Sequence, residues 1–230
     1  MRSRNKKTTE NMDWKTASQP FNERAEEYDN WFENSLLFEV EITALRAIKD
    51  SLPHPRLEIG VGPGRFGEAL NVDFGIDPAI SPLQLATRRS IIGTNGVGEH
   101  LPFQTGSMGT VFILFTLCFL SDSAAVFKEC SRIINPDGRL VIGLIPRLSS
   151  WGVLLADKGK KKHPFYRHAR MRTIAETVEL LAQNGFKVSE SWSTLLQDPK
   201  ENIQPETPRQ GINENAGFSV LVTSKKGDAR

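Results

Sequence analysis

The stretch LEIGVGPGRFG, residues 57–67, places four glycines within eight residues, directly behind a short apolar run. A glycine inside regular structure costs about 0.5–1 kcal/mol relative to alanine. Four glycines at this spacing therefore indicate a loop whose backbone must approach another group closely. The apolar run predicts a strand over 57–60, and the residues behind the loop predict a helix over 65–70. The chain is thus constrained to place a strand, a glycine-rich turn and a helix in succession.

Strands and helices alternate along the rest of the chain. Further helices are predicted over 81–89, 124–134 and 173–184, and strands over 57–60, 72–77, 91–94, 111–120, 139–145, 186–195 and 218–224. This alternation is typical of an α/β fold with a doubly wound, mostly parallel sheet, here of seven strands. The last two strands have no helix between them, which favours an antiparallel strand at one edge.

The N-terminal region divides into a tail and a helical pair. Residues 1–20 are polar and show no apolar period, so the sequence predicts a flexible tail. From Phe21 the apolar residues recur at helical spacing, and two helices are predicted within 21–52. Ser35 is the candidate cap of the second helix. Residues 21–230 are predicted to form a single domain.

Composition excludes several classes of protein. The formal net charge of +2 argues against a dedicated nucleic-acid binder, in which a basic stripe is expected. No apolar run reaches the length of a membrane span. The two cysteines, Cys118 and Cys130, have the spacing of neither a zinc site nor a redox pair, and no metal site is predicted. We therefore expect a cytoplasmic protein.

The glycines of the loop match two different sequence motifs. Gly62, Gly64 and Gly67 form G-x-G-x-x-G, the dinucleotide fingerprint, which is weak evidence when it stands alone. Gly60, Gly62 and Gly64 form G-x-G-x-G, preceded by Glu58 on the strand. Because the strand is predicted to end at Ile59, the second motif is favoured. Glu58 is then expected to accept hydrogen bonds from the loop amides, the alternative being an exposed charge at the strand end.

Asp77 ends the second predicted strand. A carboxylate at this place can accept hydrogen bonds from the two hydroxyls of a ribose. The alternative is an ordinary Asp–Pro turn with Pro78. Both nicotinamide and sulfonium cofactors carry a ribose, so Asp77 alone does not choose between them.

Four stretches, taken in order, resemble the class I S-adenosylmethionine-dependent methyltransferases, in particular a branch of small prokaryotic, methyltransferase type 11-like members. LEIGVGPGRF resembles their glycine-rich motif, and VDFGIDPA resembles the acidic strand end that follows it. GVGEHLPF and FKECSRIINPDGRLVIGLI resemble the segments around the fourth and fifth strands. The resemblance implies a Rossmann-like fold, S-adenosylmethionine as cofactor and S-adenosylhomocysteine as product. It also implies a cofactor-binding half over 56–145 and a substrate-side half over 146–230.

The resemblance assigns roles to individual residues. The glycines at 60, 62 and 64 would face the methionine moiety and the ribose, and Asp77 with Pro78 would hold the ribose. Residues 21–52 would form a helical lid. The remaining cofactor-binding residues implied are two beside the adenine, two near the methionine amino group and one on the lid, namely Gly98, Glu99, Thr116, Leu117 and Tyr28.

The acceptor side is predicted less sharply, and no catalytic residue is assigned. Candidate substrate residues are Trp31 on the lid and three in the segment HPFYRHARMR, namely Tyr166, Arg167 and His168. The alternatives are ordinary core packing for Trp31 and a basic surface loop for the segment. We expect methyl transfer to a small molecule by a monomer or homodimer. A protein or RNA acceptor, non-catalytic cofactor binding, and a nicotinamide oxidoreductase are the alternatives.

Overall fold

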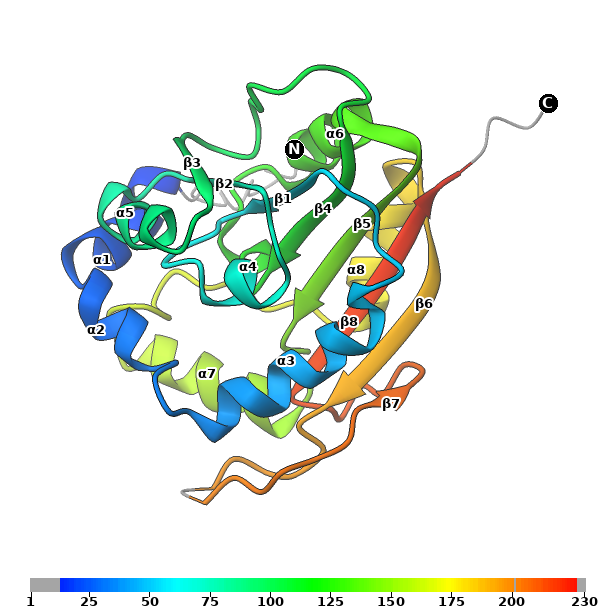
Figure 1. The fold of residues 1–230 in the computed structure, drawn as a ribbon. Coiled ribbons are helices and arrows are strands. Elements are labelled where there is room, and N and C mark those ends of the chain that lie inside the picture. The colour runs from blue at the N-terminus through cyan, green and yellow to red at the C-terminus, as the bar shows by residue number, and fades with distance from the viewer. Residues whose placement is uncertain (1–12, 201, 227–230) are drawn as a thin grey trace, which may run out of the picture.

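A central sheet organises the chain in the computed structural model, which describes residues 13–200 and 202–226 (Figure 1). Within these residues the strand order is β3-β2-β1-β4-β5-β8-β6-β7. The bounds are β1 Arg56–Ile59, β2 Phe74–Asp77, β3 Ile92–Asn95, β4 Met108–Leu114, β5 Ile134–Leu144, β6 Phe186–Thr194, β7 Arg209–Gln210 and β8 Phe218–Lys225.

The first five strands run parallel, and the order reverses beside β1. Strand β1 pairs in parallel with β2 on one side and with β4 on the other. The chain therefore leaves β1 in one direction and later returns to its other side, which creates the switch point where ligands bind in such sheets. Strand β8 runs antiparallel to both of its neighbours, β5 and β6.

Helices cover both faces of the sheet (Figure 1). They are α1 Trp14–Glu23, α2 Ala25–Asn30, α3 Leu36–Lys49, α4 Arg65–Ala69, α5 Ile80–Arg88, α6 Ser123–Ile133, α7 Ser150–Lys160 and α8 Ile174–Gln183. Alternate side chains of β4 enter different cores, as the period of two in a strand requires. Phe112 and Leu114 pack with residues of α3, α4 and α5. Val111 and Ile113 pack with residues of α6 and α8. The predicted doubly wound α/β fold is confirmed.

Three local predictions need correction. The short strand β7 raises the described strands from seven to eight and pairs antiparallel with β6 at the edge. Strand β4 ends at Leu114 rather than at residue 120, because Phe115 adopts a left-handed backbone with φ +55° and a short 3₁₀ turn, Leu117–Phe119, follows. Helix α1 begins at Trp14, within the segment predicted as a flexible tail, while residues 1–12 lie outside the described part.

Candidate functional site

A first cavity lies at the switch point of the sheet. Its floor comes from the carboxyl ends of β1, β2 and β4, which contribute Gly60, Asp77 and Thr116 respectively. Helices α1 and α2 close it from the other side with Phe21 and Tyr28. The sheet thus brings together residues that lie far apart in the sequence.

The glycine loop follows β1 and adopts left-handed backbone at three positions. The φ angles are +73° at Gly60, +52° at Gly62 and +83° at Gly64. A side chain at Gly60 would collide with Thr116, and one at Gly64 would lie 2.9 Å from the backbone of Ala86. The G-x-G-x-G motif therefore describes the loop, because the left-handed backbone favours glycine at all three positions and close packing also requires it at Gly60 and Gly64.

Gly62 offers the cleanest test of the loop as a binding surface. A Cβ at this position would meet only Tyr28, at 3.7 Å, so Gly62→Ala adds a methyl group to the lining of the first cavity. We expect the variant to bind S-adenosylhomocysteine more weakly in calorimetry and to lose about 1–2 kcal/mol of stability to left-handed strain. Gly211→Ala is the matched control, because Gly211 has a φ of +105° and open space around it. Equal affinities in the two variants would contradict this reading of the loop.

Asp77 orders the loop through its backbone. Its Oδ2 accepts a hydrogen bond from the Gly62 amide at 2.8 Å, and its Oδ1 accepts one from the Ala79 amide at 2.8 Å. Burial raises the pKa of Asp77 to about 6, although these two hydrogen bonds act in the opposite direction. Each oxygen keeps a further lone pair for a ligand in the first cavity.

Glu58 does not have the predicted role in shaping the loop. Its side chain is 3% exposed, and its Oε2 has no hydrogen-bond partner among the described residues. Burial, and secondly the negative charge of Asp77, raise the pKa of Glu58 well above its ordinary value. Glu58 therefore favours its protonated form more than a free glutamate does, and it lines the first cavity with an Oε2 that is unpaired among the described residues. The loop-ordering contact falls to Asp77 instead.

A second cavity, of about 410 Å³, adjoins the first. The two share a wall of five aromatic residues, namely Phe21, Tyr28, Phe32, Phe115 and Phe119. Helices α3 and α7, the end of β5 and residues 163–172 contribute most of the other lining. Its volume lies in the range of small-molecule sites, roughly 300–1,000 Å³.

The aromatic side chains between the cavities form one continuous cluster. Tyr28 contacts Phe21, Trp31, Phe32 and Phe165 with ring centroids 5.1–5.4 Å apart. Phe165 is 2% exposed, so the segment after α7 reaches the centre of this cluster. Edge-to-face pairs of this kind add about 0.5–1.5 kcal/mol each beyond their buried area.

Most of the predicted cofactor-binding residues meet at the first cavity. Nine of them line it: Tyr28, Glu58, Gly60, Gly62, Asp77, Pro78, Gly98, Glu99 and Thr116. Leu117 lines the second cavity instead, and Gly64 packs against α5. Of the predicted substrate residues, Trp31 and Tyr166 line the second cavity. Arg167 and His168 are absent from the described lining of both cavities.

Two groups of site residues were missed from the sequence, although each carried a signal. Trp14, Ala17 and Phe21 line or flank the first cavity, and their spacing of three and four is that of a helix face. Glu41 lines the second cavity, and it lies four residues from both Leu37 and Leu45 on the apolar face of α3. A charged residue on an apolar face is the signal that points to a site.

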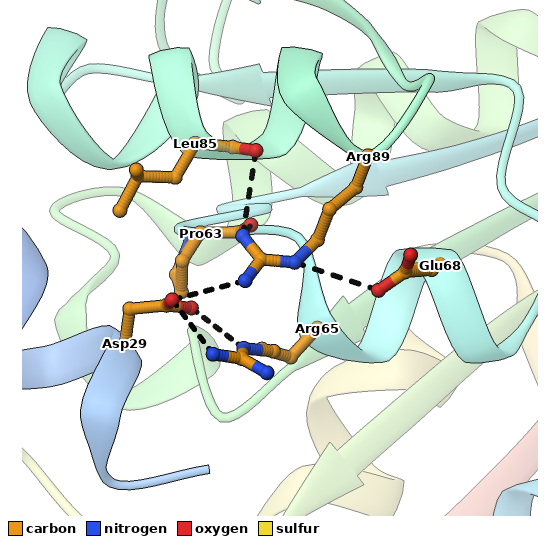
Figure 2. Close-up of polar contacts among 6 residues, drawn as sticks. All are labelled: Asp29, Pro63, Arg65, Glu68, Leu85 and Arg89. Carbon is orange, nitrogen blue, oxygen red and sulfur yellow. Dashed lines mark hydrogen bonds and ion pairs between the residues drawn. The ribbon is translucent and has the colours of Figure 1, made fainter. Parts of the chain in front are cut away.

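Helix α2 is tied to the glycine loop by ion pairs, as Figure 2 shows. Asp29 accepts two hydrogen bonds from Arg65 at 2.7 and 2.8 Å and one from Arg89 at 2.9 Å. Arg89 also donates to the Pro63 carbonyl within the glycine loop at 2.8 Å. Burial alone would raise the pKa of Asp29, but the bonds from both arginines outweigh it and the pKa is lowered. We call Asp29, Arg65 and Arg89 the lid latch.

Comparisons with known proteins agree with this arrangement. The model of a family described as "Methyltransferase domain" matches residues 57–142. An uncharacterised protein of Mycobacterium tuberculosis is 41% identical over 198 residues, which cover 84% of this chain and 70% of the relative. An uncharacterised protein of Methanocaldococcus jannaschii is 32% identical over 207 residues, covering 89% and 98% of the two chains.

A solved structure is similar over most of its length. It is a Thermotoga maritima S-adenosylmethionine-dependent methyltransferase, described as a possible histamine N-methyltransferase. The TM-score is 0.81 at 30% identity, covering 91% of this chain and 100% of the other. The fold and the cavity at its switch point define a Rossmann-like methyltransferase. The chain belongs to the S-adenosylmethionine-dependent methyltransferase family, and S-adenosylmethionine is its cofactor.

Two absences hold for the residues that the structure describes. No helix among them is long and apolar enough to cross a membrane. Within the same part of the chain, no group of three or more histidine, cysteine or acidic side chains is placed to hold a metal ion.

Proposed function

We propose that this protein transfers a methyl group to a small-molecule acceptor bound in the second cavity. The observation that carries the proposal is the aromatic wall that the two cavities share. A donor in one cavity and an acceptor in the other would meet where the two cavities adjoin, beside these aromatic side chains. The Thermotoga neighbour is described as a possible histamine N-methyltransferase, an activity on a small molecule, which supports the same class of acceptor.

The first cavity fits the cofactor by the chemistry of its lining. Gly60 and Gly62 leave the backbone open, Asp77 has lone pairs for the ribose hydroxyls, and the buried Glu58 lacks a partner that a polar ligand would supply. We assign Gly98 and Glu99 to the adenine and Thr116 to the methionine end. When bound, the sulfonium supplies an activated methyl group.

The protein's contribution is alignment and exclusion of water. Holding two reactants in line supplies roughly 7–11 kcal/mol of the barrier reduction. Tyr28 and Phe165 would keep water from the reacting centre, because both belong to the aromatic cluster that divides the cavities. A cytoplasmic location is part of the proposal, and the two free cysteines support it.

The cofactor assignment leads to a direct binding prediction. We expect S-adenosylmethionine and S-adenosylhomocysteine to bind in calorimetry, and NAD to bind weakly. The reason is that β1 ends at Ile59 and the loop begins at Gly60, with a φ of +73°. The motif that starts at the strand end is therefore G-x-G-x-G, and the dinucleotide motif from Gly62 starts two residues too late. Tight NAD binding without detectable binding of S-adenosylhomocysteine would contradict the cofactor assignment.

A labelled-methyl screen tests the acceptor class. The protein and methyl-labelled S-adenosylmethionine are incubated separately with pools of metabolites, proteins and RNA. Label incorporated into the metabolite pool alone is the expected result. Incorporation into protein or RNA would replace the proposal with the corresponding macromolecular acceptor, and S-adenosylhomocysteine binding without any incorporation would favour a non-catalytic binding protein.

A further inference from the structure

Glu41 is a buried carboxyl group in the second cavity for which the fold provides no partner. It lies on α3 among Val40, Ile42 and Leu45, and it is 6% exposed. Among the described residues no hydrogen bond or ion pair reaches it, yet it lines the cavity. Buried polar groups in folded proteins are nearly always paired, so an unpaired carboxyl group on a cavity wall indicates a partner supplied by a ligand.

The position of Glu41 costs stability in the free protein. Burial raises the pKa of its carboxyl group to about 8, so the group is mostly protonated at neutral pH. In the unfolded chain the same group would be ionised at that pH. The raised pKa therefore reduces stability progressively as the pH increases from the unfolded value toward 8. A residue that lowers stability and faces a cavity is a candidate for function.

Glu41 is the one carboxyl group among the described residues that line the second cavity. Burial, and secondly neighbouring negative groups that include Glu41, raise the pKa of both Tyr28 and Tyr166, so their phenols stay neutral. Burial lowers the pKa of His163 and raises that of Cys118, which keeps both uncharged. Two cations also line the cavity: Lys158 is exposed to solvent, and Arg172 donates to Ser123 at 3.4 Å.

Aromatic rings line the same cavity as this carboxyl group. The lining includes Trp31, Phe38, Trp151, Phe165 and Tyr166. Faces of such rings attract cations through the negative charge density above the ring. They also offer flat apolar surface to a ring or hydrocarbon body. A carboxylate inside an aromatic cavity is therefore suited to a ligand that is apolar at one end and cationic at the other.

We propose that the second cavity takes a primary or secondary amine carried on a small aromatic or apolar body, with Glu41 as its anchor and proton acceptor. This inference rests on the proposed function, because it specifies the acceptor for the same pair of cavities. It adds the chemical class of the substrate and the residue that recognises it.

The reaction step balances with Glu41 as the base. An ammonium group that enters displaces the proton of the Glu41 carboxyl group to solvent and pairs with the carboxylate. The ammonium nitrogen then gives one proton to Glu41 and regains its lone pair. That nitrogen forms a bond to the methyl carbon while the carbon–sulfur bond breaks, and sulfur keeps the electron pair of the broken bond. Glu41 finally returns its proton to solvent, leaving a carboxylate paired with the methylated ammonium product.

The binding experiment uses matched amines and alcohols on the complete protein saturated with S-adenosylhomocysteine. 2-Phenylethylamine and tryptamine are compared with their neutral isosteres, 2-phenylethanol and tryptophol, by calorimetry at pH 7. The amines are expected to bind at least tenfold more tightly than the alcohols. Titration in two buffers of different ionisation enthalpy should show release of about one proton per amine bound.

Three variants on α3 separate recognition from folding. Glu41→Gln should lower amine affinity about ten- to a hundredfold, as expected for a lost charge-assisted contact, and should leave alcohol and S-adenosylhomocysteine affinities unchanged. Glu41→Asp should restore part of the amine affinity. Glu39→Gln is the matched control, because Glu39 lies on the same helix in an exposed ion pair with Arg46. Glu41→Gln should also melt at a higher temperature than wild type at pH 8.

The outcomes distinguish this inference from the proposed function. If the wild-type protein fails to bind S-adenosylhomocysteine, the proposed function and the amine inference are both wrong. If it binds S-adenosylhomocysteine and methylates phenols, thiols or carboxylic acids but not amines, the proposed function stands and the amine inference is overturned. Equal affinity for amines and alcohols, or unchanged amine affinity in Glu41→Gln, overturns it as well.

Discussion

Replacing Asp77 by alanine is expected to lower the affinity for S-adenosylhomocysteine tenfold to several hundredfold. The assignment gives Asp77 two ribose hydroxyls. At about 0.7–1.8 kcal/mol for each contact, between neutral and weakly charge-assisted hydrogen bonds, the total loss is roughly 1.4–3.6 kcal/mol. The same carboxylate accepts from the amides of Gly62 and Ala79, so the variant also loses the contacts that order the glycine loop. Calorimetry gives the dissociation constant, and circular dichroism verifies that the variant is folded.

Two variants show whether the loss is specific. Asp77→Asn keeps the shape of the side chain, but it places an amide donor opposite a backbone N–H and should bind nearly as weakly as Asp77→Ala. Asp137→Ala removes an exposed carboxylate on β5 and should leave the affinity unchanged. A folded Asp77→Ala variant with wild-type affinity would reduce Asp77 to a turn residue.

The raised pKa of Asp77 makes cofactor binding depend on pH. Only the ionised carboxylate can accept from both ribose hydroxyls and both backbone amides, and its pKa is about 6. Affinity for S-adenosylhomocysteine should therefore fall as the pH decreases through 6. Folding stability depends on pH in the opposite direction. Because the ionised group is buried, stability decreases as the pH rises from the pKa of the unfolded chain, about 3.9, toward 6. In Asp77→Asn the pH dependence of binding in this range should disappear.

The parts of the site that could be predicted from the sequence share one property. Gly60, Gly62 and Asp77 each occupy a position that the local pattern defines, at a strand end next to a turn. Backbone conformation fixes the residue type at such positions, so a single sequence carries the information. The order of strands and helices was predictable for the same reason, since apolar period and turn residues are local signals.

The missed parts depend on contacts between distant segments. The structural role of Asp29 depends on its contacts with Arg65 and Arg89, which lie 36 and 60 residues further along the chain. Asp77, rather than Glu58, accepts the hydrogen bond from the Gly62 amide, because the parallel pairing of β1 and β2 brings the end of β2 beside the start of the loop. Helix α1 was taken for a tail because its stabilising surface is another part of the protein, namely α5 and the first cavity.

The lid latch changes what the sequence alone indicates about residues 21–34. Their polar composition predicts a segment held by few contacts and ordered only by ligand. The latch and the aromatic cluster around Tyr28 add specific contacts in the free protein. We therefore expect the amides of α2 to be protected from hydrogen exchange without ligand, and opening of the lid to require breakage of the latch.

Asp29→Ala should release the lid. The change removes the Asp29 carboxylate from two arginines, at a cost of about 3 kcal/mol. This is the lower end for a buried pair, because both guanidinium groups keep some solvent contact and Arg89 keeps its ion pair with Glu68 at 3.4 Å. Hydrogen exchange of α2 should accelerate, and S-adenosylhomocysteine should dissociate faster, because Arg89 also holds the Pro63 carbonyl of the glycine loop. The lowered pKa of Asp29 keeps the latch ionised above its unfolded value of about 3.9, so the effect should be constant between pH 5 and 8.

Glu27→Ala is the control within the same helix. Glu27 forms an exposed pair with Arg24 at 3.3 Å, of the kind that contributes about 0–1 kcal/mol. If α2 exchanges equally fast in Asp29→Ala and Glu27→Ala, the latch does not hold the lid, and aromatic packing alone accounts for its position. If only Asp29→Ala exchanges fast and saturating S-adenosylhomocysteine restores its protection, ligand and latch stabilise the same closed state, as linkage between binding and a local opening requires.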